Sequence, residues 1–204
     1  MWHFWGGKNV KFSDTYCRGF RRGFDDSAWS LGQNGAGYER EEGYESLIKD
    51  GFDFDEAMYG KATSLYLRFP FELDSIDTIN SAQKVLLRMK CDDGFVAYLN
   101  GVKVASANAP DTPAWDSVAT NTREGTSGTS IHTISLSSFK DELLTGTNVL
   151  AIQLLNTGVT SSGMLCSPEI LATTTDDAPS PSARLYSRPI PLDKSQTVRA
   201  RVKT

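Results

Sequence analysis

The dipeptide Asn100-Gly101 lies between two short apolar runs, residues 95–99 and 102–105. Such a pattern is the strongest short-range signal for a β-hairpin. A type I′ turn needs a positive φ at both of its central residues, and Asn and Gly adopt that conformation at low cost. The sequence therefore predicts two strands joined here by a two-residue turn.

Further segments have the alternating or continuously apolar character of β-strands. They are residues 63–71, 84–91, 130–136 and 147–155. The last of them is almost continuously apolar, so we expect it to be covered on both faces. Pro70 is expected to mark a sheet edge or the end of its strand, because proline cannot donate to the ladder. Asp92-Asp93-Gly94 predicts a turn in which the two aspartates act as caps.

Helical signals are few and short. Residues 45–48 and 55–59 could each form a turn or two, and residues 137–144 predict a short helix with Ser137 as its cap and Gly146 after its end. Many short strands with Gly- and Asn-containing turns and few helices indicate an all-β sandwich or barrel.

The composition changes after residue 172. Residues 173–182 form a polar, Pro-containing linker, and residues 183–186 and 197–202 follow as two strand-like segments. Two strands are too few for an independently stable domain. We therefore expect residues 1–172 to be one sandwich and residues 183–204 to be a fragment of a second β module.

Charge and hydropathy exclude several classes of protein. The chain has 204 residues, 39% of them hydrophobic, which is enough for a buried core. Its net charge of −4 argues against a nucleic-acid binder, which needs a concentrated basic surface. No apolar run approaches the roughly 18 residues of a membrane helix. Because we find no secretory signal either, we expect an intracellular protein or a piece of a longer one, and the strand-like C-terminus favours the second.

Metal-binding residues of the soft type are scarce. The sequence has two histidines and three cysteines, Cys17, Cys91 and Cys166, with no C-x-x-C pair. This pattern argues against a zinc site. At most one internal disulfide can form, and one thiol is then left over.

Several motifs occur together in the first 172 residues. They are Asp25-Asp26-Ser27-Ala28-Trp29, Gly37-Tyr38, Gly43-Tyr44-Glu45, the segment D-D-G-F-V-A-Y-L-N-G at 92–101 and the segment N-V-L-A-I-Q-L-L-N at 148–156. As a set they resemble the galactose-binding-like jelly-roll modules of large bacterial secreted proteins, over roughly residues 20–172. Residues 182–202 resemble the end of the immunoglobulin-like chitobiase C-terminal module. The resemblance implies a jelly-roll β-sandwich and a non-catalytic, extracellular accessory module.

Sugar binding needs aromatic faces that stack on the C–H-rich side of a pyranose ring, with polar groups that hold the hydroxyls. The candidate side chains lie in Gly- or Pro-rich context and are Trp115, Tyr38, Tyr44, Tyr59 and Trp29. Trp115 is the strongest candidate for an exposed loop aromatic. For Trp29 a place in the core is favoured, and for the tyrosines the two roles are balanced.

A calcium site is a further hypothesis, because hard cations bind clustered oxygens. Asp50, Asp53 and Asp55 form the densest acidic stretch. Their spacing is not that of an EF-hand, and a solvated acidic loop is the favoured alternative. No other cofactor is expected.

We expect a non-catalytic module that binds a polysaccharide or a cell-surface glycan beside other domains of its parent chain. The first alternative is a structural spacer or protein-interaction domain with no small ligand. The second is a glycan hydrolase that uses a pair from Glu39, Glu41, Glu42 and Glu45, but clustering in sequence does not establish convergence in space. His132 has no evident partner in the sequence.

Overall fold

A computed structural model of the chain describes residues 2–5, 19–32, 34–41, 43, 45–48, 53–123 and 126–173. The chain divides into two units, Met1–Thr174 and Thr175–Thr204. The predicted linker beyond Thr173 and the predicted terminal fragment 183–204 lie outside the described residues, as do Tyr44 and Asp50. All described strands and helices belong to the first unit.

The described elements are ten strands and a few single-turn helices. The strands are β1 (Trp2–Trp5), β2 (Ser30–Gly32), β3 (Ala36–Glu39), β4 (Ser64–Leu73), β5 (Lys84–Asp92), β6 (Gly94–Leu99), β7 (Val102–Ala107), β8 (His132–Ser135), β9 (Gly146–Leu155) and β10 (Gly163–Thr173). The helices are η1 (Glu45–Leu47), α1 (Asp55–Met58), α2 (Asp77–Asn80), α3 (Thr126–Thr129) and η2 (Ser137–Glu142). The predicted all-β class is confirmed.

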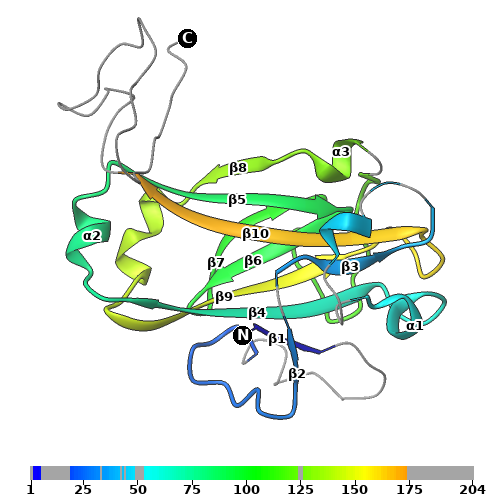
Figure 1. Cartoon of the computed structure of the whole chain (residues 1–204), viewed down its shortest axis with the longest axis horizontal. Coiled ribbons are helices and arrows are strands. Elements are labelled where there is room, and N and C mark those ends of the chain that lie inside the picture. Colours follow the sequence, from blue (N-terminus) through cyan, green and yellow to red (C-terminus); the bar gives the residue numbers. More distant parts are fainter. Residues whose placement is uncertain are drawn as a thin grey trace, which may run out of the picture. The chain divides into compact units, whose positions relative to one another are not determined.

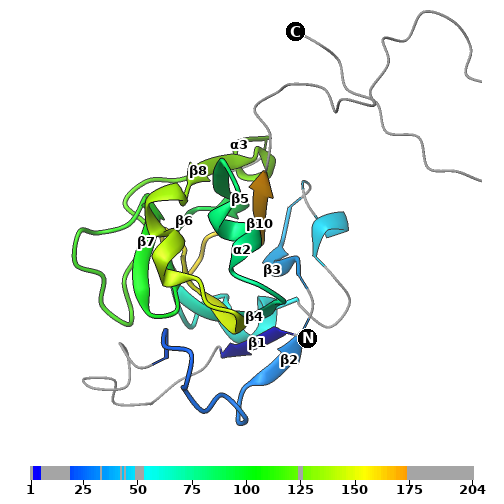
Figure 2. The same ribbon diagram turned by 90° about the vertical axis from the view of Figure 1, so that its left-hand side faces the viewer.

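The strands form two antiparallel sheets (Figure 1). Sheet A has six strands in the order β2-β1-β4-β9-β6-β7, and sheet B has four in the order β3-β10-β5-β8. The innermost pair along the chain is β6 with β7, followed outward by β5 with β8, β4 with β9 and β3 with β10. A long hairpin folded over into two layers in this way is a jelly roll. Figure 2 shows β4, β1 and β2 in one layer and β5, β10 and β8 in the other.

The tip of this rolled hairpin is the predicted Asn-Gly turn. Asn100 has φ 52° and Gly101 has φ 99°, and the turn joins β6 to its antiparallel partner β7. Both central residues thus have the positive φ of a type I′ turn, and the prediction is confirmed.

The core lies between the sheets. Strands of both sheets contribute alternate residues to it, such as Val85, Leu87 and Met89 from β5. Strand β9 is buried on both faces, as its apolar run predicted: Leu150 and Ile152 point into the core, and Ala151 packs in a second cluster on the other face.

Some local predictions were wrong. Strand β4 continues through Pro70 to Leu73, so the proline does not end it. The other position expected of Pro70, a sheet edge, is confirmed: β9 pairs with it on one side, and the pairing of β1 with β4 on the other side covers only Tyr66–Arg68. The residue at the N-cap of η2 is Leu136 rather than Ser137.

The predicted turn at Asp92-Asp93-Gly94 is instead a crossover between the sheets, and the two aspartates are not exposed turn caps. Both are buried where the chain crosses from β5 in sheet B to β6 in sheet A. The carboxylate of Asp93 accepts hydrogen bonds from the backbone N–H of Arg123 (2.7 Å) and from the backbone N–H and hydroxyl of Thr157 (both 2.9 Å). A buried carboxylate needs such partners, and here they tie two loops to the crossover.

Candidate functional site

The outward face of sheet A is covered by two loops. Residues on this face include Tyr66 and Arg68 on β4 and Gln153 on β9, and all three are buried. One cover is the segment 19–29. The other is the loop 108–120, whose Ala119 packs in a cluster with Val96 and Leu155. The two loops thus enclose polar side chains on the outward face of sheet A, and each of these side chains needs a hydrogen-bond partner in the loops.

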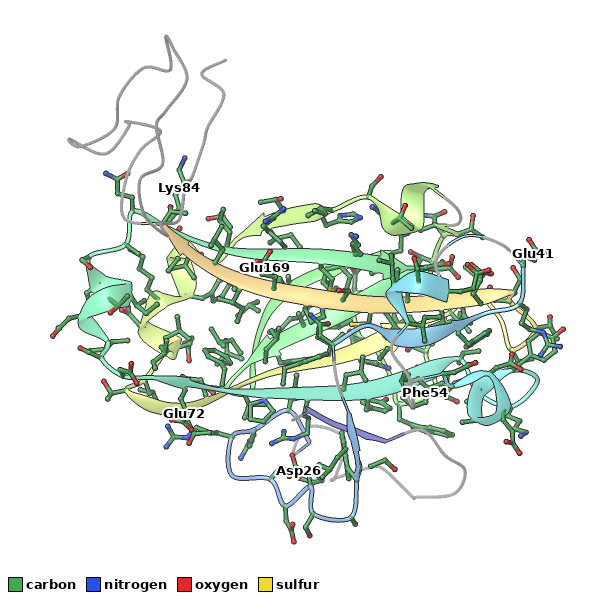
Figure 3. The ribbon with its side chains drawn as sticks, in the orientation of Figure 1. Asp26, Glu41, Phe54, Glu72, Lys84 and Glu169 are labelled. Atoms are coloured by element: carbon green, nitrogen blue, oxygen red, sulfur yellow. The ribbon has the colours of Figure 1, made fainter. Side chains whose placement is uncertain are left out.

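The first cover is anchored by Arg68, whose side chain is 3% exposed. Its Nε donates to a carboxylate oxygen of Asp26 at 2.7 Å, and its guanidinium also donates to the backbone oxygens of Gly19 and Arg21. The ring of Phe20 stacks on Tyr98, with centroids 3.9 Å apart. The buried cation therefore holds this segment on the sheet together with an apolar contact. Figure 3 shows Asp26 below β4, in this covering segment.

The second cover presents Trp115 on a tight turn. We call residues 114–117 the Trp115 turn. The N–H of Ser117 donates to the carbonyl of Ala114 at 3.3 Å, and the N–H of Ala114 donates to the Ser117 hydroxyl at 2.7 Å. The indole at the second position of the turn is 49% exposed.

Side chains of sheet A and of the residue before β4 hold all four carbonyls of this turn. Gln153 donates to the carbonyl of residue 114 at 2.8 Å, and the hydroxyl of Tyr66 donates to that of residue 115 at 2.7 Å. The hydroxyls of Thr63 and Ser64 donate to the carbonyls of residues 116 and 117 at 3.1 and 2.9 Å. Every carbonyl of the turn thus has a fixed donor, so the exposed indole stands on ordered backbone.

Exposed polar side chains occur in the same loop as the indole. Asp111, Thr112 and Asp116 are exposed in the same loop. Val118 is 45% exposed and adds apolar surface. A loop with an exposed indole and exposed carboxylate and hydroxyl groups has the two kinds of group that sugar binding needs, an aromatic face and hydrogen-bond partners.

Tyr38 lies in the core and has no exposed surface. Its hydroxyl donates to the carbonyl of Ser161 at 2.9 Å and accepts from the amide of Asn156 at 2.8 Å. Burial raises the pKa of Tyr38 to about 12. Its ring offers no face to a sugar, so of the two predicted roles the structure favours the core.

Tyr59 and Trp29 are half-buried. The guanidinium of Arg40 lies over the ring of Tyr59, 3.8 Å from its centroid, and covers one face. Trp29 packs edge-on against Phe24, with centroids 5.7 Å apart, in the cluster under the segment 19–29. Both rings are therefore partly covered by other side chains of the protein.

The acidic residues proposed for calcium also have protein partners. Asp53 accepts a hydrogen bond from the backbone N–H of Asp55 at 2.9 Å. Both oxygens of Asp55 lie 2.9 Å from Arg40. Within the described ranges, no group of three or more His, Cys, Asp and Glu residues is placed to hold a metal ion. The calcium hypothesis, including Asp50, stays a prediction.

The acidic residues of the hydrolase alternative form local contacts. Glu39 accepts from the backbone N–H of Glu41 at 3.1 Å, and Glu45 accepts from that of Gly43 at 3.3 Å. His132 lies on β8, and its Nε2 is buried without a hydrogen-bond partner in the described part of the chain. Burial and the nearby Arg123 lower the pKa of His132, so it is neutral near pH 7.

The outward face of sheet B is open and charged. Arg88 and Glu169 form an ion pair across β5 and β10 at 3.0 Å, with side chains 36% and 58% exposed. Beside them, Asn34, Lys90 and Ile131 line a depression of about 290 Å³. The sequence analysis did not predict this depression, because β10, which lines it beside β5, was not predicted as a strand.

The helices among the described residues have at most six residues each, too few to span a membrane.

Comparisons with known proteins identify no family. No protein-family profile and no curated protein matches the chain. Among solved structures, it is similar to a beta-glucuronidase from Bacteroides uniformis (15% identity, 82% of this chain and 17% of the enzyme, TM-score 0.44). A beta-glucuronidase from Ruminococcus gnavus matches at 18% identity (76% of this chain, 20% of the enzyme, TM-score 0.43). A glycosyl hydrolase family 2 member from Bacteroides cellulosilyticus matches at 13% (82% of this chain, 19% of the enzyme, TM-score 0.42). The chain spans about a fifth of the length of these enzymes.

Proposed function

We propose that this chain is a non-catalytic carbohydrate-binding module of a larger secreted protein, and that Trp115 is the platform on which a sugar ring stacks. One observation carries the proposal: Trp115 is half-exposed on a turn whose four carbonyls are all held by side-chain donors. The motif resemblance to galactose-binding-like modules supports the same class of function.

The ordered turn bears directly on affinity. Binding costs the conformational entropy of every loop and side chain that becomes ordered, about 0.5–1.5 kcal/mol for each flexible side chain. An aromatic on a turn that is already ordered avoids most of that cost. The platform is open rather than enclosed, which suits an extended polysaccharide or cell-surface glycan better than a small free sugar.

The test is retention of the full chain on a panel of soluble and insoluble polysaccharides. We expect retention by at least one of them, loss of retention in Trp115→Ala, and partial retention in Trp115→Phe. Leu144→Ala is the matched control, because Leu144 is 44% exposed and follows η2, away from the Trp115 turn. If no polysaccharide retains the wild-type chain, or if Trp115→Ala binds as well as the control, the proposal fails.

A protein-interaction role is the second candidate, and it is supported by the exposed Val118 three positions after Trp115. In that case Trp115→Ala and Val118→Ser would weaken association with a neighbouring domain of the parent chain and leave polysaccharide retention unchanged.

Hydrolase activity is not part of the proposed function. Turnover of a glycoside that disappears in Glu39→Gln would reverse that choice.

A further inference from the structure

Two cysteines face each other across the centre of sheet B. In the register of β5 and β10, Cys91 and Cys166 are Cα partners. Both are free thiols, both are buried, and both belong to the core between the sheets. Their side chains therefore leave the two strands on the same face, at directly opposite positions.

Hydrogen bonds on β5 show which way Cys91 faces. The N–H of Leu136 donates to the carbonyl of Val85 at 2.7 Å, so the backbone of Val85 points toward β8. In a strand, alternate residues direct their N–H and C=O groups to opposite neighbours. The backbone of Cys91, six residues further on, thus points toward β8 and away from β10.

Hydrogen bonds on β10 place Cys166 in the matching orientation. The N–H of Arg40 donates to the carbonyl of Ser162 at 2.9 Å, in line with the register of β3 on β10. The backbone of Cys166, four residues later, therefore points toward β3 and away from β5. Cys91 and Cys166 form a non-hydrogen-bonded pair, the closer of the two kinds in an antiparallel ladder.

This geometry suits a disulfide. The Cα atoms of a non-hydrogen-bonded pair are about 4.5 Å apart, and disulfides occur at Cα separations of about 4.4–6.8 Å. No strand has to move by a residue for the two sulfurs to bond, since the register already aligns them.

We propose that Cys91 and Cys166 are a disulfide-forming site that closes during folding in an oxidising compartment. The oxidant is a small-molecule disulfide such as oxidised glutathione. The thiolate of one cysteine attacks a glutathione sulfur, which forms a mixed disulfide and releases one glutathione thiolate. The thiolate of the other cysteine then attacks the protein sulfur and releases the second. Each cysteine loses one proton, and the two electrons reduce glutathione disulfide to two thiols.

The step belongs to folding because the folded chain protects both thiols. Neither side chain is exposed in the core. Burial raises the pKa of Cys91 to about 12 and that of Cys166 well above its ordinary value, so neither is a thiolate at neutral pH. Only the thiolate attacks a disulfide. Once formed, the bond is shielded from reductants in the same way.

The inference goes beyond carbohydrate binding and does not depend on it. A secreted chain would fold where such bonds form, whereas a cytosolic chain would keep both thiols reduced. Cys17 lies outside the described residues and supplies the competing thiol.

The experiment is refolding of the full chain from denaturant, with and without a glutathione redox buffer. Trypsin fragments are then mapped by mass spectrometry without reduction. We expect a Cys91–Cys166 crosslink, seen as a mass loss of about 2 Da. In the Cys17→Ser variant both thiols should disappear on refolding. The same buffer added to folded, reduced chain should leave the two thiols intact over the time in which refolding oxidises them.

The crosslinked chain should also melt about 10 °C higher than the reduced chain, because the bond closes a long loop in the unfolded state. Two thiols left free after oxidative refolding would overturn the inference, as would a dominant crosslink to Cys17. A lower melting temperature for the crosslinked chain would show that the strands must distort, which the register argues against. Mapping the wild-type chain keeps the result decisive even if a cysteine variant folds poorly.

Discussion

The outer faces of the two sheets are built from similar strands but differ in solvent exposure. On sheet A, Tyr66, Arg68 and Gln153 point outward and are nevertheless buried under loops. On sheet B, Arg88 and Glu169 point outward and remain in solvent. The difference lies in the partners: the first three donate to backbone carbonyls and a carboxylate of the covering loops, while the other two pair with each other. A polar residue on the outward face of a strand can thus anchor a loop as well as meet water.

The most severe way to break the cover is Arg68→Ala. It would remove the donor that Asp26 and two backbone carbonyls share in the segment 19–29. Removing one partner of a buried charge pair costs about 3 kcal/mol or more. Denaturant titration should therefore show a loss of unfolding free energy of that size. The matched control is Arg88→Ala on sheet B, whose exposed pair is worth at most about 1 kcal/mol. Equal losses in the two variants would contradict the comparison.

Alkaline titration tests whether the cover excludes water as the core does. The pKa of Tyr38 in the core is raised to about 12, from an ordinary value of 10.0, chiefly by burial. The folded state therefore keeps the proton more tightly than the unfolded state. The raised pKa of Tyr38 therefore contributes nothing to destabilise the folded state below pH 10. As the pH rises from 10 toward 12, the free energy of unfolding falls by about 2 kcal/mol. Tyr38→Phe should flatten this decline in denaturant titrations at successive pH values.

The same measurement applies to Tyr66 under the cover. Its pKa is also raised, mainly by burial. Tyr66→Phe should therefore flatten the alkaline decline as Tyr38→Phe does. If only the core tyrosine has this effect, water reaches the face of sheet A, and the two faces differ less than the structure indicates.

Tyr66→Phe at neutral pH isolates one support of the Trp115 turn. The substitution removes the hydroxyl that donates to the carbonyl of Trp115 and keeps the ring. We expect a loss of about 1 kcal/mol in stability and weaker retention on the polysaccharide that binds the wild-type chain. Tyr59→Phe serves as the control, because its ring interacts with Arg40 and its loss of a hydroxyl leaves the turn unchanged. Unchanged retention in Tyr66→Phe would separate the order of the turn from binding.

The smallest effect is expected at the open face. Lys90→Ala on sheet B removes a half-buried cation beside the Arg88–Glu169 pair. Surface substitutions of this kind change stability by about 0.5 kcal/mol or less, and polysaccharide retention should not change. A Lys90→Ala variant that no longer binds polysaccharide would move the binding site to the depression on sheet B.

Local patterns predicted the strands that have a clear apolar periodicity and missed those in which the pattern is short or interrupted. Residues 84–91 and 147–155 alternate or run apolar, and both appear as strands with bounds close to those expected. Strands β3 and β10 went unpredicted. In β10, Pro168 and Glu169 interrupt the apolar pattern. Strand β3 has only four residues, which are too few for an alternating pattern to be recognised. The chain from Gly163 to Thr173 becomes a strand because β5 and β3 pair with it on either side.

The candidate site was predictable only in part. An aromatic between Pro113 and Asp116 is recognisable as a loop residue, and Trp115 is exposed as expected. The side chains that hold the Trp115 turn could not be predicted, because Gln153 and Tyr66 lie far from it in sequence. Each occurs there in the pattern of an ordinary strand. Tyr38 shows the opposite case: a Gly-rich context suggests a loop, yet the ring is in the core.

The sequence by itself determined the local chemistry: a type I′ turn at Asn100-Gly101, strands with an apolar face, and an all-β class. These follow from backbone sterics and from side-chain periodicity, which act between near neighbours. Only the tertiary structure decided that Arg68 and Gln153 hold loops instead of facing water, that four donors hold the Trp115 turn, and that Cys91 meets Cys166. Those contacts join residues far apart in the chain, and they exist only once the long hairpin has folded over into two layers.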